Sequence, residues 1–224
     1  MQPYFMPYIG YFQLMKLVDR YVVYDDVNYI KGGWVSRNNI LMNGEKRMFT
    51  IGLQGASPNK LFNEINVGDD FKKFRKMLQT NYGKASYFHP AMELIERIVS
   101  CPERQLALFI MNSFREILNY LDIKTELVLS STLPKDCSLK GKDKVIQICK
   151  LLDADSYVNA IGGQELYDKK EFEQQGINLF FLVSEPKPYI QLSREFIPYL
   201  SIIDILMNNS TRDINNLLGS YKLV

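Results

Sequence analysis

Two adjacent carboxylates, Asp25 and Asp26, are the first residues in the chain whose type and spacing could do chemistry. They follow the apolar segment Arg20–Tyr24, and side chains just past the carboxyl end of a strand point into the crevice where α/β proteins bind ligands. A carboxylate there could bind a divalent metal ion or a hydroxyl group, act as a general base, or simply cap a turn. Neighbouring strand residues point to opposite faces, so at most one of the two reaches the crevice unless the chain bends.

The loop after these carboxylates brings together cations, amides and an aromatic ring. Arg37 offers a planar fork suited to phosphate or carboxylate, and Lys31 offers a point charge. Trp34, the only tryptophan, lies between them, which an ordinary solvated loop does not explain. The amides are Asn28, Asn38 and Asn39, and the glycines are Gly32 and Gly33. We interpret this loop as the first candidate for a substrate site.

A second candidate is the strand-to-helix transition at Asn159-Ala160-Ile161-Gly162-Gly163. Free amides at a helix start can hold an anion, and glycines let a ligand approach the backbone. The charged run Lys140–Asp143 before the preceding helix could add positive charge, or could be a solvated cap.

The elements that must position these residues are read from periodicity and turn chemistry. The segment Tyr8–Val18 predicts an apolar helix and Arg20–Tyr24 a strand. Two further strands, Asn38–Met42 and Lys46–Leu53, flank Asn43-Gly44, a pair that favours a tight hairpin turn.

The rest of the chain predicts a helical block followed by alternating strands and helices. The expected helices of the block, about residues 69–121, are Asp69–Tyr82, His89 or Pro90 to Val99, and Glu103–Leu121. Next come the strand Glu126–Leu129, the helix Lys142–Leu152, the strand Tyr157–Val158, the helix Glu165–Gln175, the strand Ile177–Val183 and closing helices at Phe196–Asn208 and Arg212–Tyr221. This alternation is typical of parallel βαβ units. We therefore expect a single α/β domain over residues 1–224, with a mainly parallel sheet flanked by helices, a hairpin and an inserted helical block.

Composition and missing motifs narrow the function classes. A net charge of +2 over 224 residues gives no electrostatic footprint of a nucleic-acid binder. Neither a dinucleotide-binding fingerprint nor a P-loop is present. The chain has a single histidine, His89, which disfavours a histidine-based zinc site and a Ser-His-Asp triad. Three cysteines without CxxC spacing favour a reducing cytoplasm. With no apolar run of membrane-spanning length, we expect a soluble cytoplasmic protein without membrane insertion.

Several ordered blocks of sequence resemble the WbqC-like protein family. They are QPYFMPYIGYF, DRYVVYDDVNYIKGGWVSRNNI, SPNKLFNEI, SSTL, KGKDKVIQICKLL, YVNAIGGQELYD and GINLFFL. They run from Gln2 to the closing helices. Relatives usually carry several apolar residues before the QPYF-like segment, whereas here Met1 directly precedes Gln2. We therefore expect either a short first strand or a start that was assigned late.

The resemblance implies a role in bacterial surface-polysaccharide (O-antigen) biosynthesis. The implied reaction is modification of a nucleotide-linked amino sugar, by transfer of an acyl or aminoacyl group to the sugar amine. The donor stays open between an acyl-adenylate, an acyl-CoA and an aminoacyl-tRNA, and ATP with magnesium stays open as a cofactor. One alternative is a metal-dependent enzyme of glycosyltransferase type. The other is a non-catalytic binding protein of a polysaccharide assembly complex. The oligomeric state stays open.

The leading hypothesis gives each candidate residue a role. Asp25 or Asp26 is the base or a metal ligand, and Lys31 and Arg37 hold the diphosphate or the tetrahedral oxyanion. The expected substrate-binding residues are Gln2, Tyr4, Asn28, Trp34, Asn38, Asn39, Gly162 and Gly163.

Overall fold

The computed structural model describes all residues from Met1 to Val224 and contains eight α-helices and nine strands. The helices are α1 (Ile9–Leu17), α2 (Lys72–Tyr82), α3 (Phe88–Val99), α4 (Leu106–Tyr120), α5 (Gly141–Leu151), α6 (Lys169–Glu173), α7 (Ile202–Asn208) and α8 (Thr211–Leu217). The strands are β1 (Arg20–Val23), β2 (Arg37–Met42), β3 (Glu45–Thr50), β4 (Leu53–Gln54), β5 (Asn66–Val67), β6 (Glu126–Leu129), β7 (Ser156–Ala160), β8 (Asn178–Ser184) and β9 (Tyr221–Leu223). Three short 3₁₀ helices are also present: η1 (Phe62–Glu64) between β4 and β5, η2 (Ser130–Thr132) after β6 and η3 (Ile161–Gly163) after β7.

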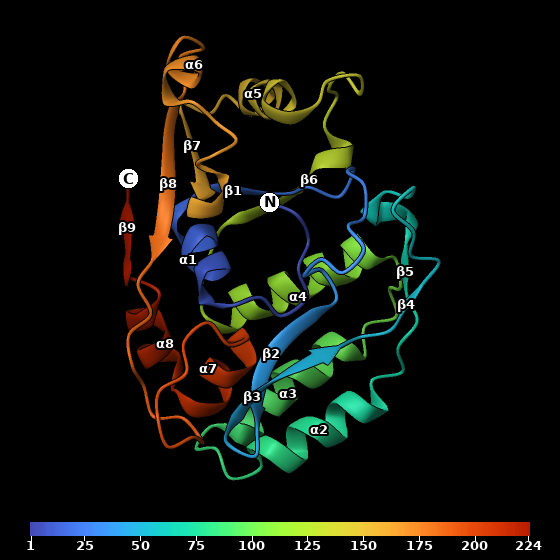
Figure 1. Cartoon of the computed structure of the whole chain (residues 1–224), viewed down its shortest axis with the longest axis vertical. Helices are drawn as coiled ribbons and strands as arrows, with labels where there is room; N and C mark the ends of the chain where they lie inside the picture. The colour runs from blue at the N-terminus through green and yellow to red at the C-terminus, as the bar shows by residue number, and fades with distance from the viewer.

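The strands form four small sheets, so the expected mainly parallel sheet is not confirmed. Parallel pairing is limited to β1 with β6 and β7 with β8, while β2–β3, β4–β5 and β8–β9 are antiparallel. Of the three strands in the alternating stretch from β6 to β8, only β7 and β8 pair in parallel, and β6 pairs with β1 instead. β1 and β6 are only four residues long. A strand this short offers few backbone hydrogen bonds to a further strand. The architecture is therefore a mixed α/β one with small sheets (Figure 1).

The first residues of the chain extend the β1–β6 pair. The Met1 amino group donates to the Val22 carbonyl oxygen at 2.8 Å, and the Tyr24 amide donates to the Met1 carbonyl oxygen at 2.8 Å. These two bonds follow the slanted pattern of a parallel ladder. Burial lowers the pKa of the Met1 amino group to about 5. Because the pairing is parallel, Gln2 and the residues after it leave at the same end as Asp25.

The hairpin is confirmed. Asn43 and Gly44 have φ values of 54° and 76°, and the register closes with Met42 opposite Glu45. A two-residue loop with positive φ at both positions matches the twist of the flanking strands.

The inserted helical block is also confirmed, as α2, α3 and α4. Asp69 and Asp70 accept hydrogen bonds from the amides of Phe71 and Lys72 at 2.7 and 3.0 Å, which fixes the start of α2. Phe71 stacks on Phe109 of α4 with ring centroids 5.5 Å apart. These rings belong to the main core of 43 buried residues, whereas six other residues around α5, α6 and β8 form a smaller second cluster.

The predicted closing helices are wrong at their ends. The helix expected from Phe196 begins only at α7, because Pro198 interrupts the segment and Gln191 binds both backbone groups of Ile197. The Ser201 side chain then accepts from the Ile203 amide and starts the helix. The segment predicted as helix up to Tyr221 ends instead at Leu217, and β9 follows as a strand paired with β8.

A buried carboxylate ties α7 to the long segment between β8 and α7. Asp204 is fully buried and accepts from the Tyr82 hydroxyl at 2.8 Å, the Tyr189 hydroxyl at 2.6 Å and the Gln191 amide at 2.8 Å. No cation pairs with it. Burial therefore raises the pKa of Asp204, although the three donors oppose that shift.

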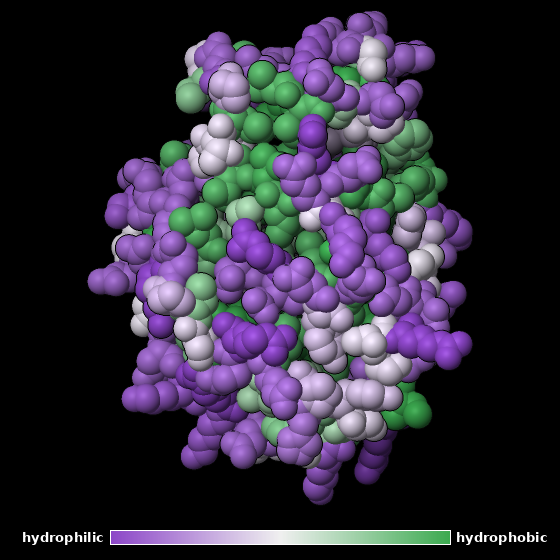
Figure 2. Space-filling model, turned by 180° about the vertical axis from the view of Figure 1, so that it is seen from behind, coloured by the Kyte–Doolittle hydropathy of each residue, from purple (hydrophilic) through white to green (hydrophobic).

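Polar residues cover much of the surface. Seen from behind, hydrophobic residues reach the surface mainly in the upper half of the molecule, and the lower half is mostly polar (Figure 2). No helix is both long and apolar enough to cross a membrane.

The raised pKa of Asp204 predicts a pH-dependent stability. In the window between the pKa of an unfolded Asp, about 3.9, and the higher folded pKa, the folded state binds more protons than the unfolded state. Stability must therefore fall as pH rises through that window. Urea unfolding should show wild type losing stability relative to Asp204→Asn as pH rises from about 4 towards neutrality. A difference that does not change with pH would contradict the raised pKa.

Candidate functional site

A buried ion cluster lies where β1 ends. The Asp26 carboxylate accepts from Lys135 Nζ at 2.8 Å and Lys144 Nζ at 3.0 Å, both at Oδ2. The two lysine side chains are 2% and 9% exposed. Lys144 Nζ also donates to the Asp26 carbonyl oxygen at 3.1 Å and lies 4.9 Å from the centroid of the Tyr24 ring. We call Asp26, Lys135 and Lys144 the lysine cluster.

Parallel pairing explains why these residues meet. Val23 of β1 lies opposite Leu129 of β6, so the residues that follow both strands leave the sheet at one edge. Asp26 comes from the first strand, and Lys135 comes from the loop after η2 and also donates to the Ser130 carbonyl oxygen. Lys144 comes from the first turns of α5.

Asp25 holds this edge together rather than facing the lysines. Its side chain is 1% exposed and accepts from the Ser131 amide at 2.9 Å and the Asn63 side-chain amide at 3.4 Å. Its carbonyl oxygen accepts from the Asn63 amide. Both carboxylates thus lie at the predicted edge, pointing to different partners as strand alternation requires. Their catalytic roles stay predictions, and the contacts favour Asp26 over Asp25.

The lysine cluster carries excess positive charge and unused hydrogen-bonding capacity. Burial alone would raise the pKa of Asp26, but hydrogen bonds from Lys135 and Lys144 outweigh it, so the pKa of this carboxyl is lowered. Two ammonium groups against one carboxylate leave one net positive charge. Asp26 Oδ1 and the Ser130 hydroxyl oxygen are both buried, and neither meets the geometry of a hydrogen bond. The Ser130 hydroxyl is nevertheless close enough to the Asp26 carboxylate to help the two lysines lower its pKa.

The predicted loop residues Trp34 and Arg37 lie together with Tyr4. The Arg37 guanidinium carbon is 5.3 Å from the centroid of the Trp34 ring, and the Tyr4 ring centroid is 6.3 Å from the same ring. Arg37 also donates to the Gly32 carbonyl oxygen, which helps to shape the loop. Trp34 is 49% exposed.

The amides of the first candidate loop are dispersed. Asn38 is buried and donates to the Met6 carbonyl oxygen at 2.6 Å, and Asn28 donates to the Pro58 carbonyl oxygen at 2.9 Å. Asn39 lies within β2, and Lys31 and Gln2 are exposed. None of these five makes a hydrogen bond or ion pair with the lysine cluster.

The second candidate, Gly162 and Gly163, follows β7 and lies in η3. A Cβ at Gly163 would lie 2.4 Å from Asn159 Nδ2, so this glycine permits close packing of the asparagine side chain. Gly162 has open space around it. Lys142 of the nearby charged run pairs with Glu171. No hydrogen bond joins the two glycines to the lysine cluster.

Sequence reasoning missed Lys135, Lys144 and Ser130 as site residues. Only Ser130 could have been found from the sequence, because it directly follows the predicted strand Glu126–Leu129 and strand ends mark ligand sites. Lys135 lies five residues beyond it, in a loop whose path the sequence does not reveal. Lys144 lies in a helix whose other residues read as an ordinary amphipathic pattern.

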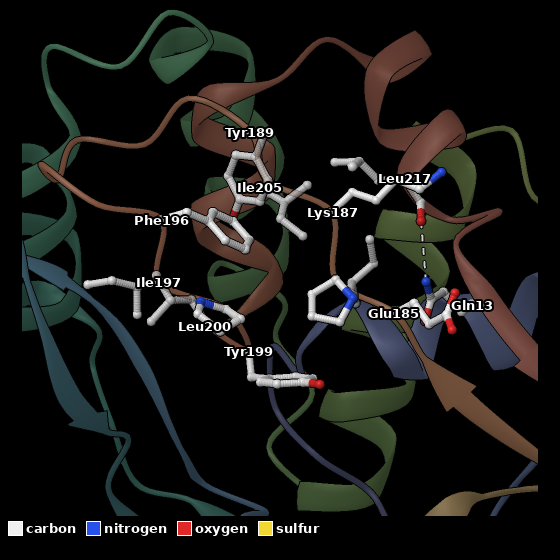
Figure 3. A pocket seen from close by; sticks show the side chains of 13 residues that line it. Gln13, Glu185, Lys187, Tyr189, Phe196, Ile197, Tyr199, Leu200, Ile205 and Leu217 are labelled. Carbon is white, nitrogen blue, oxygen red and sulfur yellow. Dashed lines mark hydrogen bonds between the residues drawn. The ribbon is translucent and has the colours of Figure 1, made fainter.

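Two cavities lie elsewhere, and no residue predicted for the site lines either one. A narrow cavity of about 20 Å³ lies among α1, α7 and the segment after β8, with Gln13 donating to the Leu217 carbonyl oxygen at its edge (Figure 3). That volume holds about one water molecule, far below the roughly 300 Å³ of a small-ligand site. The other, an open polar depression of about 890 Å³, lies beside the hairpin turn and Gln191–Ile197.

Asp26→Asn keeps the shape of the side chain and removes the charge that faces the lysines. We expect the free energy of unfolding at neutral pH to fall by about 2–4 kcal/mol, because two largely buried ammonium groups lose their counter-ion. Since the folded pKa of Asp26 is lowered, its stabilisation is present above the unfolded pKa of about 3.9 and is lost as pH falls through the folded value. In urea unfolding the gap to wild type should close below about pH 4. A gap that persists in acid would show that the charge of Asp26 does not stabilise the cluster.

A protein-family model and a known protein each match most of the chain. The model of the WbqC-like protein family matches residues 2–216. The uncharacterized protein Rv1507c of Mycobacterium tuberculosis (strain ATCC 25618 / H37Rv) is 27% identical over 215 residues, which are 92% of this chain and 91% of that protein. No solved structure matches the chain. The matched region includes the lysine cluster, Trp34 and Arg37.

Proposed function

Because the chain belongs to the WbqC-like protein family, we propose that it acts on a nucleotide-linked amino sugar in surface-polysaccharide (O-antigen) biosynthesis. The proposed reaction is transfer of an acyl or aminoacyl group to the sugar amine. Membership of the family supports a role in polysaccharide biosynthesis in general, and the residues of the site support the choice of a sugar nucleotide as substrate.

The lysine cluster is the observation that carries the proposal. A sugar nucleotide presents a diphosphate, and ammonium groups bind phosphate as point charges. Lys135 and Lys144 each make two hydrogen bonds within the protein, and an ammonium group has three donors. Each ammonium group therefore has one donor that is not used within the protein, although the lysine side chains are only 2% and 9% exposed. Asp26 holds both ammonium groups at one point without cancelling their combined charge.

As an alternative to binding the diphosphate, the same charge could serve the chemistry of amide formation. The amine nitrogen attacks the activated carboxyl carbon, a C–N bond forms, and the carbonyl oxygen becomes an oxyanion. The intermediate collapses with loss of the leaving group, and the amine gives up a proton to a base. Lys135 and Lys144 can stabilise either the oxyanion or the departing anion. Asp26 orients them, and its lowered pKa makes it a weak base.

The metal-dependent alternative gains no support from the arrangement of the carboxylates. A divalent cation needs free carboxylate oxygens. Asp26 Oδ2 is taken by two lysines, both oxygens of Asp25 accept hydrogen bonds from Ser131 and Asn63, and Asp26 Oδ1, which has no partner, is buried. Two ammonium groups beside Asp26 also repel a cation. Nothing observed favours the purely non-catalytic alternative, which predicts no turnover.

A nucleotide-linked amino sugar should stabilise the fold. At about 100 times its dissociation constant a ligand adds roughly 2.7 kcal/mol, which raises the melting temperature by a few degrees. The measurement is a thermal-shift series with UDP-linked and dTDP-linked amino sugars, followed by mass spectrometry for amide products with acyl-CoA, or with a free amino acid plus ATP and magnesium. If the whole series leaves the melting curve unmoved at millimolar concentration, the proposed substrate class is wrong.

Replacing the lysine cluster by apolar residues separates binding from folding. The triple variant Asp26→Leu, Lys135→Met, Lys144→Met removes both signs of charge together, and such replacements of buried ion groups are often neutral for stability. We expect it to fold and to bind the sugar nucleotide at least tenfold more weakly, because each charged hydrogen bond lost costs about 1.5–3 kcal/mol. Lys150→Met, at an exposed lysine on the same helix, is the matched control. Unchanged affinity in a folded triple variant would place the diphosphate elsewhere.

A further inference from the structure

Five aromatic rings form a continuous cluster on the N-terminal segment, and we call it the tyrosine cluster. Its members are Tyr4, Tyr8, Tyr11, Trp34 and Tyr199. The ring centroids of Tyr4 and Tyr11 are 5.4 Å apart, those of Tyr8 and Tyr11 5.9 Å, and those of Tyr8 and Tyr199 6.1 Å. These three contacts are edge-on, so successive rings present both faces and edges.

The cluster is open at both ends. Trp34 is 49% and Tyr199 is 52% exposed, Tyr8 and Tyr11 are half-buried, and Tyr4 is buried at 7% exposed. The backbone on which the cluster is built is firmly held, because the Ser201 hydroxyl and Asn38 both donate to the Met6 carbonyl oxygen. In Figure 3 Tyr199 lies at the lower edge of the small cavity, on the segment that precedes α7. Large rings left half-exposed on a held backbone are typical of a binding surface.

The hydroxyl groups of the four tyrosines have no hydrogen-bond partner within the protein. By contrast, the hydroxyls of Tyr82 and Tyr189 are fully used by the Asp204 network. Burial raises the pKa of Tyr4, and the nearby Tyr11 and Tyr8 raise it further. The pKa values of Tyr8 and Tyr11 are also raised, chiefly by burial. All three therefore stay protonated at physiological pH, where each can donate one hydrogen bond and accept others.

A guanidinium completes the cluster. Arg37 lies over Trp34, and its proximity acts on Tyr4 to lower the pKa that burial raises. Arg37 forms no ion pair with a carboxylate, and its Nε is buried without a hydrogen-bond partner. No carboxylate belongs to the cluster, so it suits a neutral or anionic ligand.

We propose that the tyrosine cluster binds the pyranose ring of the sugar substrate. The identity of the ring as that of an amino sugar rests on the proposed function. A pyranose packs its C–H face on an aromatic ring and turns its hydroxyls outward, and each hydroxyl both donates and accepts. Tyr4, Tyr8 and Tyr11 offer groups of that same dual kind. A nucleobase instead needs fixed patterns of donors and acceptors along its edge, which the cluster lacks.

The parallel pairing of Met1 gives the N-terminal segment its direction. Gln2 and the residues after it leave the β1–β6 pair at the end where Asp26 lies. The diphosphate and the sugar of one molecule are covalently linked, so the proposal requires that both groups can be reached by one ligand.

Trp34 is the only tryptophan, which makes its fluorescence a direct report on this surface. The experiment titrates the full chain with UDP-glucosamine, with the free sugars glucosamine and galactosamine, and with UMP. We expect UDP-glucosamine and at least one free sugar to change the emission saturably, and UMP not to. The double variant Tyr8→Phe, Tyr11→Phe keeps both rings and should weaken the sugar response about tenfold.

Tyr120→Phe is the matched control, because Tyr120 is partly buried near Arg97 and Glu93, away from the cluster, and should bind like wild type. A response to UMP alone, no response to any sugar, or full affinity in the double variant would overturn the inference. The two proposals fail separately. Sugar binding at Trp34 with no amide product from any donor removes the transferase and keeps the sugar site. Amide formation that proceeds normally in the double variant removes the sugar site and keeps the transferase.

Discussion

The contact on which this edge of the molecule depends is one carboxylate shared by two lysines. Asp26 lies just after β1, Lys135 follows β6 and Lys144 lies in the first turn of α5, so a single side chain joins three segments that are separate in the sequence. Placing two ammonium groups so deeply is costly, and a carboxylate between them is what makes it tolerable. Asp25 supports the same edge through Ser131 and Asn63.

The buried carboxylates of Asp204 and Asp26 have partners of opposite kinds, and their pKa values shift in opposite directions. Asp204 has only neutral donors, which are fully used and fix the segment before α7, and the pKa of its carboxyl is raised. Asp26 has cationic partners, a lowered pKa and an oxygen left without a partner. The first arrangement fixes the fold, and the second leaves one net positive charge, on which the proposed binding of a diphosphate rests. The tyrosine cluster adds hydroxyls without a hydrogen-bond partner on the segment that leaves the β1–β6 pair at the same strand end.

Much of the fold could be predicted from the sequence, because it depends on local patterns. The helical block follows from apolar spacing, and the hairpin follows from Asn43-Gly44, which tolerates positive φ. The prediction failed where contacts with other segments determine the backbone conformation. Gln191 captures the backbone of Ile197 and keeps that segment from becoming helix, and β9 exists only because β8 offers it an edge. How many strands join one sheet also depends on packing between elements.

The sequence by itself determined where polar chemistry gathers: Asp25 and Asp26 at a strand end, with Trp34 and Arg37 in the loop beyond, because strand periodicity fixes where the strand stops. Only the tertiary structure decided which residues share that place. It brought in Lys135 and Lys144, turned Asn38 inward to hold Met6, and left Lys31 in solvent. The reason is that an ion pair is made across space. Its partners are chosen by how β1, β6 and α5 pack, and no spacing along the chain encodes a contact between residues 26 and 144.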